Sequence, residues 1–535
     1  MKPDKIKNSA SSQSKDGVSI QNCITIAVLF LAIVVRVILL DGSFWMDEAA
    51  QALQSVRPFS EQYRIPADFQ PPLMHYLVHF FSYYSESESW LRQVPLLAGL
   101  GMIAGVMQIS RMLGLKYGWV GGVLLALSPF HVYFSQELRP YSLAAVWTIW
   151  SWIVALWWSE SSRTPQERVL GMIGIGFFNL LSWYSMYISI FFSMSQFLWL
   201  GLQFRAFKQK AGFQEFIPYL ATTIFYLPWV PFLYEQFRVA TALTRSLPGW
   251  SNIVGFEPWK SLPLTIWQLS LGIEPFDPTM RVWFILMVLG LLGILFVVRL
   301  HGLYKLDAKL FHRFIGFISM SAVIPIILVW IVSFWLPILQ PKRVMAAQII
   351  VPLSAVLLVQ GLEKKSQKKK KTRERLSYFA SVSSIGMLGL MYLSGLGNYW
   401  TTPSLQREHW RESMQDLRDL YSVENTVVVF GFEAPFAPWE WYTRQEKLKF
   451  STVSFETIPV QIDDRAEFVS RIRPYERILI LDYLRDVTDP ERLIESWVQD
   501  EGYRGVTSYD TGNFGFIRIH ERESLRVSLQ NEELL

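Results

Sequence analysis

Long apolar runs recur through most of this chain, and they limit its fold more than any other feature. The first run covers residues 22–40, about the length that a helix needs to cross a hydrocarbon core of about 30 Å. Ten more runs follow, near residues 91–111, 119–134, 141–158, 169–184, 186–204, 213–234, 281–299, 314–339, 344–362 and 377–398. Because a soluble protein would not carry so many, the sequence predicts a polytopic α-helical membrane protein with about 11 transmembrane helices.

The positions of lysine and arginine predict how these helices are oriented. Most of them fall in alternate loops, and the block at residues 364–375 is strongly basic. Lys and Arg are enriched on the cytoplasmic side, so we expect residues 1–20 to form a cytoplasmic tail. The basic block then lies at the cytoplasmic surface between two helices, where it would bind anionic lipids rather than nucleic acid. We therefore expect a protein of the cell (inner) membrane, with an extracytoplasmic C-terminus.

The chain divides into two regions of different character. Residues 21–399 carry the apolar runs, with extracytoplasmic loops predicted at 41–90 and 235–280. Residues 400–535 alternate short β-branched or aromatic runs with helical patterns, which predicts an extracytoplasmic α/β domain. No glycine-rich nucleotide-binding motif occurs there. The segment His409-Trp410-Arg411 opens this domain, and we expect no role for it beyond docking onto the membrane domain.

Cysteine usage and the first apolar run limit the chemistry further. Cys23 is the only cysteine, so the sequence predicts neither a disulfide framework nor a cysteine-based metal site. The first run is long and has no small-residue cleavage site after it, so we expect a retained anchor rather than a signal peptide.

Two adjacent acids, Asp47 and Glu48, follow directly after the first apolar run. Carboxylates at a membrane surface are costly to desolvate unless they meet a cation or take part in proton transfer. The aromatic residues Phe44 and Trp45 precede them at the depth where aromatic belts form. The acids are therefore candidate functional residues, although a solvated loop would also accommodate them.

A second polar stretch connects the predicted helices at 119–134 and 141–158. It holds more polar and aromatic side chains than a short connection needs: His131, Tyr133, Gln136, Glu137, Arg139 and Tyr141. Arg139 could bind a phosphate through paired hydrogen bonds, or could simply extend toward the membrane surface beside Glu137. We expect this stretch to lie on the same side of the membrane as Asp47.

Further candidates lie at the same predicted membrane surface. Lys342 and Arg343 are adjacent cations that would bind either lipid headgroups or the phosphate of a lipid substrate. His75 and His79 are four residues apart in a predicted interfacial helix at 73–84. Zinc could bind at that spacing, but no third ligand is evident, so we predict no metal site and keep His75 as a pocket candidate.

Taken in order, these motifs resemble those of the GT-C superfamily of membrane glycosyltransferases. The resemblance rests on the Asp47-Glu48 pair, Pro71-Pro72-Leu73, Ser128-Pro129, the segment 135–141 and Pro341 with Arg343. It covers residues 20–365. The most similar group is glycosyltransferase family 39, which includes protein O-mannosyltransferases and aminoarabinose transferases.

The resemblance implies transfer of a sugar from a polyprenyl-phosphate donor to a hydroxyl group of a lipid, glycan or protein outside the cytoplasm, with inversion. By the same resemblance Asp47 would be the general base and Glu48 its neighbouring acid, while Arg139 and Arg343, with Lys342, would bind the donor phosphate. The remaining candidates would line the substrate pocket: His75, His131, Tyr133, Gln136, Glu137 and Tyr141. No cofactor is required, although Mg²⁺ or Mn²⁺ could bridge the carboxylates and the phosphate.

Two other functions fit the same sequence. The chain could translocate a lipid-linked sugar or polysaccharide, or it could be a non-catalytic scaffold for envelope assembly. A translocator should place ionisable groups across the whole depth of the membrane. Here they gather at one face, with Arg36 as the main exception, which favours the transferase.

Overall fold

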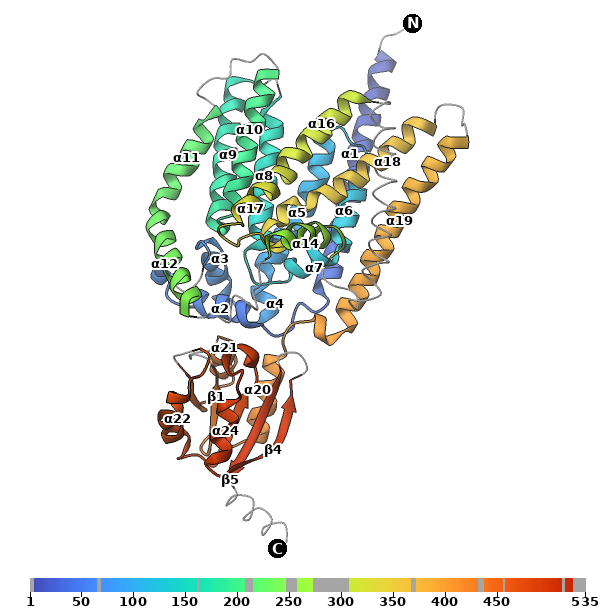
Figure 1. Ribbon diagram of the computed structural model, residues 1–535. Coiled ribbons are helices and arrows are strands. Elements are labelled where there is room, and N and C mark those ends of the chain that lie inside the picture. Colours follow the sequence, from blue (N-terminus) through green and yellow to red (C-terminus); the bar gives the residue numbers. More distant parts are fainter. Residues whose placement is uncertain are drawn as a thin grey trace.

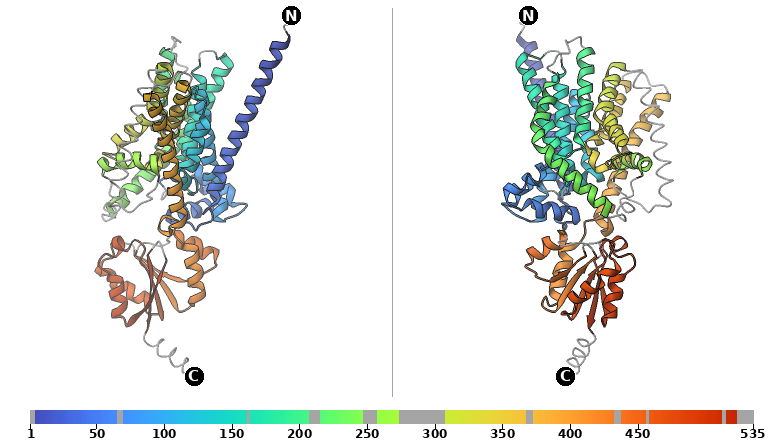
Figure 2. Two further views of the ribbon diagram at one scale, coloured as in Figure 1. Left: turned by 90° about the vertical axis from the view of Figure 1, so that its right-hand side faces the viewer. Right: turned by 60° about the vertical axis from the view of Figure 1, so that its left-hand side comes forward.

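A computed structural model describes residues 4–64, 69–160, 163–206, 215–246, 257–272, 307–366, 372–431, 437–455, 458–511 and 515–522. It has two parts, which we call the helical part (residues 4–401) and the sheet part (residues 402–522). The sheet part lies against one end of the helical part, and the start of helix α1 lies at the other end (Figure 1). Figure 2 shows the same separation from two further directions.

Helices build the whole helical part. The first half contains α1 (Asp4–Val37), α2 (Met46–Ser55), α3 (Leu73–Ser82), α4 (Glu88–Leu91), α5 (Gln93–Met112), α6 (Gly118–Leu127), α7 (Pro129–Ser135) and α8 (Tyr141–Trp158). The second half contains α9 (Pro165–Ser185), α10 (Ser189–Ala206), α11 (Ile217–Tyr226), α12 (Val230–Ser246), α14 (Pro258–Leu271), α16 (Ala308–Ile318), α17 (Ile324–Val332), the 3₁₀ segment η5 (Pro341–Ile349), α18 (Ile350–Ser366) and α19 (Thr372–Thr401). The predicted interfacial helix at 73–84 corresponds to α3.

Several of these helices are suited to a membrane. In the described part of the chain, five segments are long and apolar enough to span one: Ile20–Val37, Glu88–Met112, Tyr141–Trp158, Ala308–Val332 and Pro341–Gln360. The pair α6 and α7 would make a sixth. Helices α9, α10, α11 and α19 fall at four more of the predicted positions but are not in this set, and the run at 281–299 lies outside the described residues. The membrane protein class agrees with the prediction, but the number of eleven helices is not confirmed.

The break between α6 and α7 follows from the local sequence. The two helices meet at an angle of 67°. Pro129 has no backbone N–H and disfavours a helical conformation at the residue before it, so α6 ends there. Ser128 is extended and its hydroxyl accepts a hydrogen bond from the backbone N–H of His131, which caps α7. The break delivers the chain to residues 136–140, between α7 and α8.

The sheet part is built around five strands: β1 (Thr426–Phe430), β2 (Ser451–Val453), β3 (Arg477–Leu481), β4 (Tyr503–Asp510) and β5 (Phe516–Arg522). The order is β2-β1-β3-β5-β4, with β1 parallel to β2 and β3 and the other two pairings antiparallel. All five strands fall within the predicted α/β region. The chain also forms helices α20 (Trp410–Leu420), α21 (Ala437–Gln445), α22 (Arg465–Ile472), α23 (Arg485–Thr488) and α24 (Leu493–Asp500).

One hydrophobic core joins the two parts. Phe44 and Met74 of the helical part are fully buried in the same cluster as Trp410, Trp441 and Tyr442 of the sheet part. The ring centroids of Phe44 and Trp441 are 5.7 Å apart. The phenol of Tyr442 accepts a hydrogen bond from the backbone N–H of Phe44 and donates one to Glu88 (2.9 Å). The segment that carries Asp47 is therefore held by contacts with both the helical part and the sheet part.

Candidate active site

Asp47 lies in the first turn of α2, immediately after the chain leaves α1. The backbone N–H groups at the start of a helix favour negative charge, so this position suits a carboxylate. Arg139 approaches it from the connection between α7 and α8, and its guanidinium donates to the backbone carbonyl of Asp47 (3.4 Å). Both side chains are partly exposed. Two segments that are 92 residues apart thus meet at this point.

Two more cations reach Asp47 from the start of η5. The ammonium of Lys342 lies 5.6 Å from the ring centroid of Trp45 and 5.0 Å from that of Tyr141. Lys342 and Arg343 both interact electrostatically with Asp47, and both are partly exposed. Two separate segments therefore place three cations around Asp47: Arg139 at its backbone carbonyl, and Lys342 and Arg343 near its side chain. The side chains of Arg and Lys carry positive charge and hydrogen-bond donors but no acceptors. The three cations can therefore bind an anion such as a phosphate.

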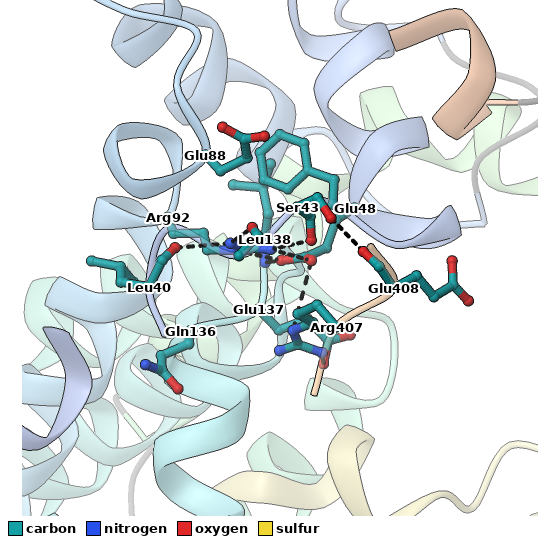
Figure 3. A network of polar contacts seen from close by, with 12 residues as sticks. Leu40, Ser43, Glu48, Glu88, Arg92, Gln136, Glu137, Leu138, Arg407 and Glu408 are labelled. Atoms are coloured by element: carbon teal, nitrogen blue, oxygen red, sulfur yellow. Dashed lines mark hydrogen bonds and ion pairs between the residues drawn. The ribbon is translucent and has the colours of Figure 1, made fainter. Parts of the chain in front are cut away.

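Glu48 faces a different environment from its neighbour. It is fully buried, and Arg92 donates to both of its carboxylate oxygens, from Nε at 2.9 Å and from Nη2 at 2.6 Å (Figure 3). The backbone N–H of Leu138 donates to Glu48 at 2.7 Å. Burial alone would raise the pKa of Glu48, but the charges and hydrogen bonds of Arg92, together with the charge of Arg407, lower it below the ordinary value. The structure does not bring Glu48 to the surface that Asp47 reaches.

Arg92 also fixes the chain where it leaves α1. Its guanidinium donates to the backbone carbonyls of Leu40 (2.8 Å), Gly42 and Ser43 (3.2 Å). A fully buried arginine needs such acceptors, because an unpaired buried charge is costly. The position of α2 therefore depends on Arg92 and Glu48 together.

Glu137 is the second fully buried acid at this end of the helices. Arg407, from the connection between α19 and α20, forms ion pairs with Glu137 (3.5 Å) and Glu48 (3.8 Å). Its guanidinium also lies 3.8 Å from the ring centroid of Tyr133. Burial raises the pKa of Glu137, and the nearby charges of Arg407 and Lys342 offset only part of this effect.

The other predicted pocket residues lie in structural hydrogen-bond networks. Gln136 donates to the backbone carbonyls of Arg36 (2.8 Å) and Ile38 (2.6 Å), and the ring of His131 contacts the guanidinium of Arg36 (2.6 Å). These contacts join α7 to the end of α1. They orient the segment that carries Arg139 rather than line an open surface, since both side chains are buried.

His75 belongs to another cluster, between α2 and α3. Its ring is buried and hydrogen-bonded with Gln51 (2.7 Å) and Gln70 (3.1 Å). His79 contacts the backbone carbonyl of Ser55 (2.8 Å) instead. Within the described ranges, no group of three or more His, Cys, Asp or Glu side chains is placed to hold a metal ion.

Four residues that shape the site are not among the candidates expected from the sequence: Arg92, Arg407, Glu408 and Tyr483. Glu408 accepts hydrogen bonds from Tyr483 (3.0 Å) and from the indole of Trp410 (2.7 Å), and both Glu408 and Tyr483 interact electrostatically with Asp47. The sheet part therefore lies directly beside Asp47. For Arg407 and Glu408, the available signal was the charged and aromatic character of residues 407–411. The predicted docking segment covers only residues 409–411 of that stretch.

Solved structures share this architecture. ArnT from Cupriavidus metallidurans in the apo state has a TM-score of 0.52 and 11% identity, with 96% of this chain and 99% of that chain covered. ArnT from the same organism bound to undecaprenyl phosphate has a TM-score of 0.51 and 12% identity, with 95% of this chain and 99% of that chain covered. The oligosaccharyltransferase of Archaeoglobus fulgidus in the apo form has a TM-score of 0.50 and 12% identity, with 92% of this chain and 74% of that chain covered.

No family model matches the chain, and no curated protein matches it by sequence. At these identities the likeness concerns the fold alone. The chain shares its fold with ArnT and with this oligosaccharyltransferase, and the family 39 group stays a prediction.

Proposed function

We propose that this chain is a membrane glycosyltransferase that takes a sugar from a polyprenyl-phosphate donor and passes it to a hydroxyl group outside the cytoplasm. The observation that carries the proposal is the convergence of three cations on Asp47. Arg139 contacts its backbone carbonyl, and Lys342 and Arg343 interact electrostatically with its side chain. The solved ArnT complex with undecaprenyl phosphate supports the donor class, because the two chains share a fold.

The chemistry follows from the two kinds of charge in the site. The acceptor hydroxyl attacks the anomeric carbon of the sugar and loses its proton to the carboxylate of Asp47. The bond between the anomeric carbon and the phosphate oxygen breaks, and its electron pair stays on the phosphate. Arg139, Lys342 and Arg343 stabilise the charge that develops there. A single displacement of this kind inverts the anomeric centre.

The role of Asp47 can be tested with Asp47→Asn. The amide keeps the shape of the side chain but cannot accept the proton, so we expect the rate of transfer to fall by about 10²–10⁴-fold. Transfer of labelled sugar from a polyprenyl-phosphate donor in membranes would measure it. Asp41→Asn is the matched control, because Asp41 is an acid in the same segment with a side chain that is 68% exposed, and it should keep full activity.

The same membranes distinguish the competing functions. Turnover of Asp47→Asn close to that of the unaltered chain would exclude Asp47 as the base. Movement of the labelled lipid across the bilayer without transfer would instead identify a translocator. If neither transfer nor movement of the lipid is detected, the scaffold function is the one that remains.

A further inference from the structure

We propose that Arg407 is a positioning residue for the transfer reaction: it holds the segment of Asp47 and the segment of Arg139 in their working arrangement. This inference rests on the proposed function for its catalytic consequence. Arg407 belongs to neither segment. It comes from the connection between α19 and α20, where the helical part passes into the sheet part (Figure 3).

The contacts of Arg407 reach both segments at once. Its Nε lies 3.8 Å from Glu48, and its Nη1 lies 3.5 Å from Glu137. Its Nη2 donates to the backbone carbonyl of Tyr133 (3.2 Å). The guanidinium also stacks on the aromatic ring of Tyr133, 3.8 Å from the ring centroid. The side chain of Arg407 is 4% exposed and those of Glu48 and Glu137 are 0% and 1% exposed. Water therefore cannot replace these interactions readily.

The two acids lie close in sequence to the proposed base and to a proposed phosphate ligand. Glu48 follows Asp47, and Glu137 precedes Arg139 by two residues. Holding the two carboxylates on one planar guanidinium therefore fixes the separation between the proposed base and a proposed phosphate ligand. Arginine suits this task because its donors form a rigid fork and its flat face stacks on an aromatic ring.

The charges of the buried network show why Arg407 is needed. Glu48 and Glu137 are balanced by Arg92 and Arg407, so the four side chains are neutral together. Glu48 keeps Arg92 if Arg407 is removed. Glu137 would lose its ion pair, and its Oε1 already has no hydrogen-bond partner among the described residues. Glu137 would then keep only the weaker electrostatic attraction of Lys342, so this buried carboxylate near Arg139 would move toward water or toward another cation.

Three variants of the full chain test the proposal. Arg407→Gln removes the charge and the fork, Arg407→Lys keeps only the charge, and Arg411→Gln is the matched control. Arg411 also joins the sheet part to the first loop, through Glu88 (3.2 Å) and Asp41 (3.7 Å), but is 26% exposed and contacts other partners. We expect kcat to fall about 100-fold in Arg407→Gln, since small misplacements of reacting groups cost that much. The KM for the polyprenyl-phosphate sugar should change by less than about threefold.

The conservative variant and the control complete the kinetic test. The kcat of Arg407→Lys should be about tenfold higher than that of Arg407→Gln, because lysine keeps the positive charge but lacks the planar fork. Arg411→Gln should retain the kcat of the unaltered chain. A folded Arg407→Gln protein with a kcat within about twofold of the unaltered chain, or an equal loss in Arg411→Gln, would overturn the proposal. If Arg407→Gln does not fold, a normal kcat in Arg407→Lys would overturn it and a reduced kcat at an unchanged melting midpoint would support it.

Hydrogen exchange separates this proposal from the proposed function. In Arg407→Gln, the amides of α2 and of residues 136–139 should exchange faster than in Arg411→Gln. If the unaltered chain transfers no sugar, the proposed function fails, and exchange alone decides whether Arg407 holds the two segments. Equal exchange in the two variants would refute that role.

Discussion

At the scale of single residues, the two buried acids Glu48 and Glu137 show how differently one ion-pair network treats its members. The pKa of Glu48 is lowered, because Arg92 and Arg407 outweigh the effect of burial, whereas burial dominates at Glu137 and raises its pKa. The fold thus favours the charged form of Glu48 more strongly than that of Glu137. Sequence alone shows two acids near a membrane surface and cannot distinguish these cases.

The contrast predicts different effects of the same substitution. Glu48→Gln removes one partner of a buried ion pair and should cost about 3–5 kcal/mol, because it leaves the Arg92 charge uncompensated. Glu137→Gln should cost less than Glu48→Gln, because Arg407 keeps Glu48 as a partner and the pKa of Glu137 is raised rather than lowered. Thermal unfolding of the purified proteins would compare the two midpoints. Equal losses would contradict this account of the network.

The contribution of Glu48 to stability should also depend on pH. Because its folded-state pKa lies below the ordinary value of 4.5, its stabilisation is fully present above that value and is lost as the pH falls through the lowered pKa. The difference in melting midpoint between the unaltered chain and Glu48→Gln should therefore stay constant from pH 7 to about pH 5 and shrink below about pH 4. A difference that shrinks already near pH 6 would contradict the direction of the shift.

Sequence reasoning reached some of the site residues and not others, for a physical reason. Asp47, Arg139, Lys342 and Arg343 were found because charged residues at the ends of apolar runs are unusual. Arg92 resembles any loop arginine in sequence, and its burial depends on a partner 44 residues away. Arg407 is 270 residues from Glu137, so only the tertiary structure brings them together.

At the scale of secondary structure elements, the break between α6 and α7 positions the connection that carries Arg139. Pro129 accounts for the interruption of the predicted run at 119–134, because proline ends helices in a predictable way. Strand β4 has a weaker sequence signal, since only its first residue is buried and the usual alternation is absent. Helix α19 packs against the break through Gly395, where an added Cβ would lie 2.8 Å from Cγ of Pro129.

This close approach can be tested on α19 itself. Gly395→Ala should force Pro129 and α7 to shift, at a cost of about 1–3 kcal/mol, and should reduce transfer by moving Arg139. Gly397→Ala is the matched control, because an added Cβ there meets nothing within 4 Å among the described residues. It should stabilise the helix by up to about 1 kcal/mol. Melting midpoints and transfer rates of the two variants would decide, and similar behaviour of both would exclude the packing argument.

At the scale of the whole molecule, the sheet part and the first loop share one core and do not behave as separate units. The sequence predicted both parts and their approximate boundary from the change in hydrophobic pattern. It could not predict that Trp410, Trp441 and Tyr442 bury their side chains against Phe44, because an aromatic residue looks the same in an internal core and at an interface.

Two tryptophans of the sheet part test this coupling. Trp441→Ala and Trp497→Ala each remove a large buried side chain, and each should destabilise the sheet part by about 3–5 kcal/mol. Trp441 contacts Phe44, whereas Trp497 packs in a core formed only by residues of the sheet part. Hydrogen exchange in α2 should therefore increase in Trp441→Ala but not in Trp497→Ala. The same increase in both variants would show that the contact with Phe44 is not what couples the parts.

The shared core also has a consequence for biosynthesis. Phe44 and Tyr442 are 398 residues apart in the chain. Ribosomes add about 5–20 residues per second, so roughly 20–80 s pass between the synthesis of the two contact surfaces. During that time the aromatic face around Phe44 has emerged without its cover. Nascent chains of this protein should therefore require a chaperone, or a temporary cover from lipid, until translation is complete.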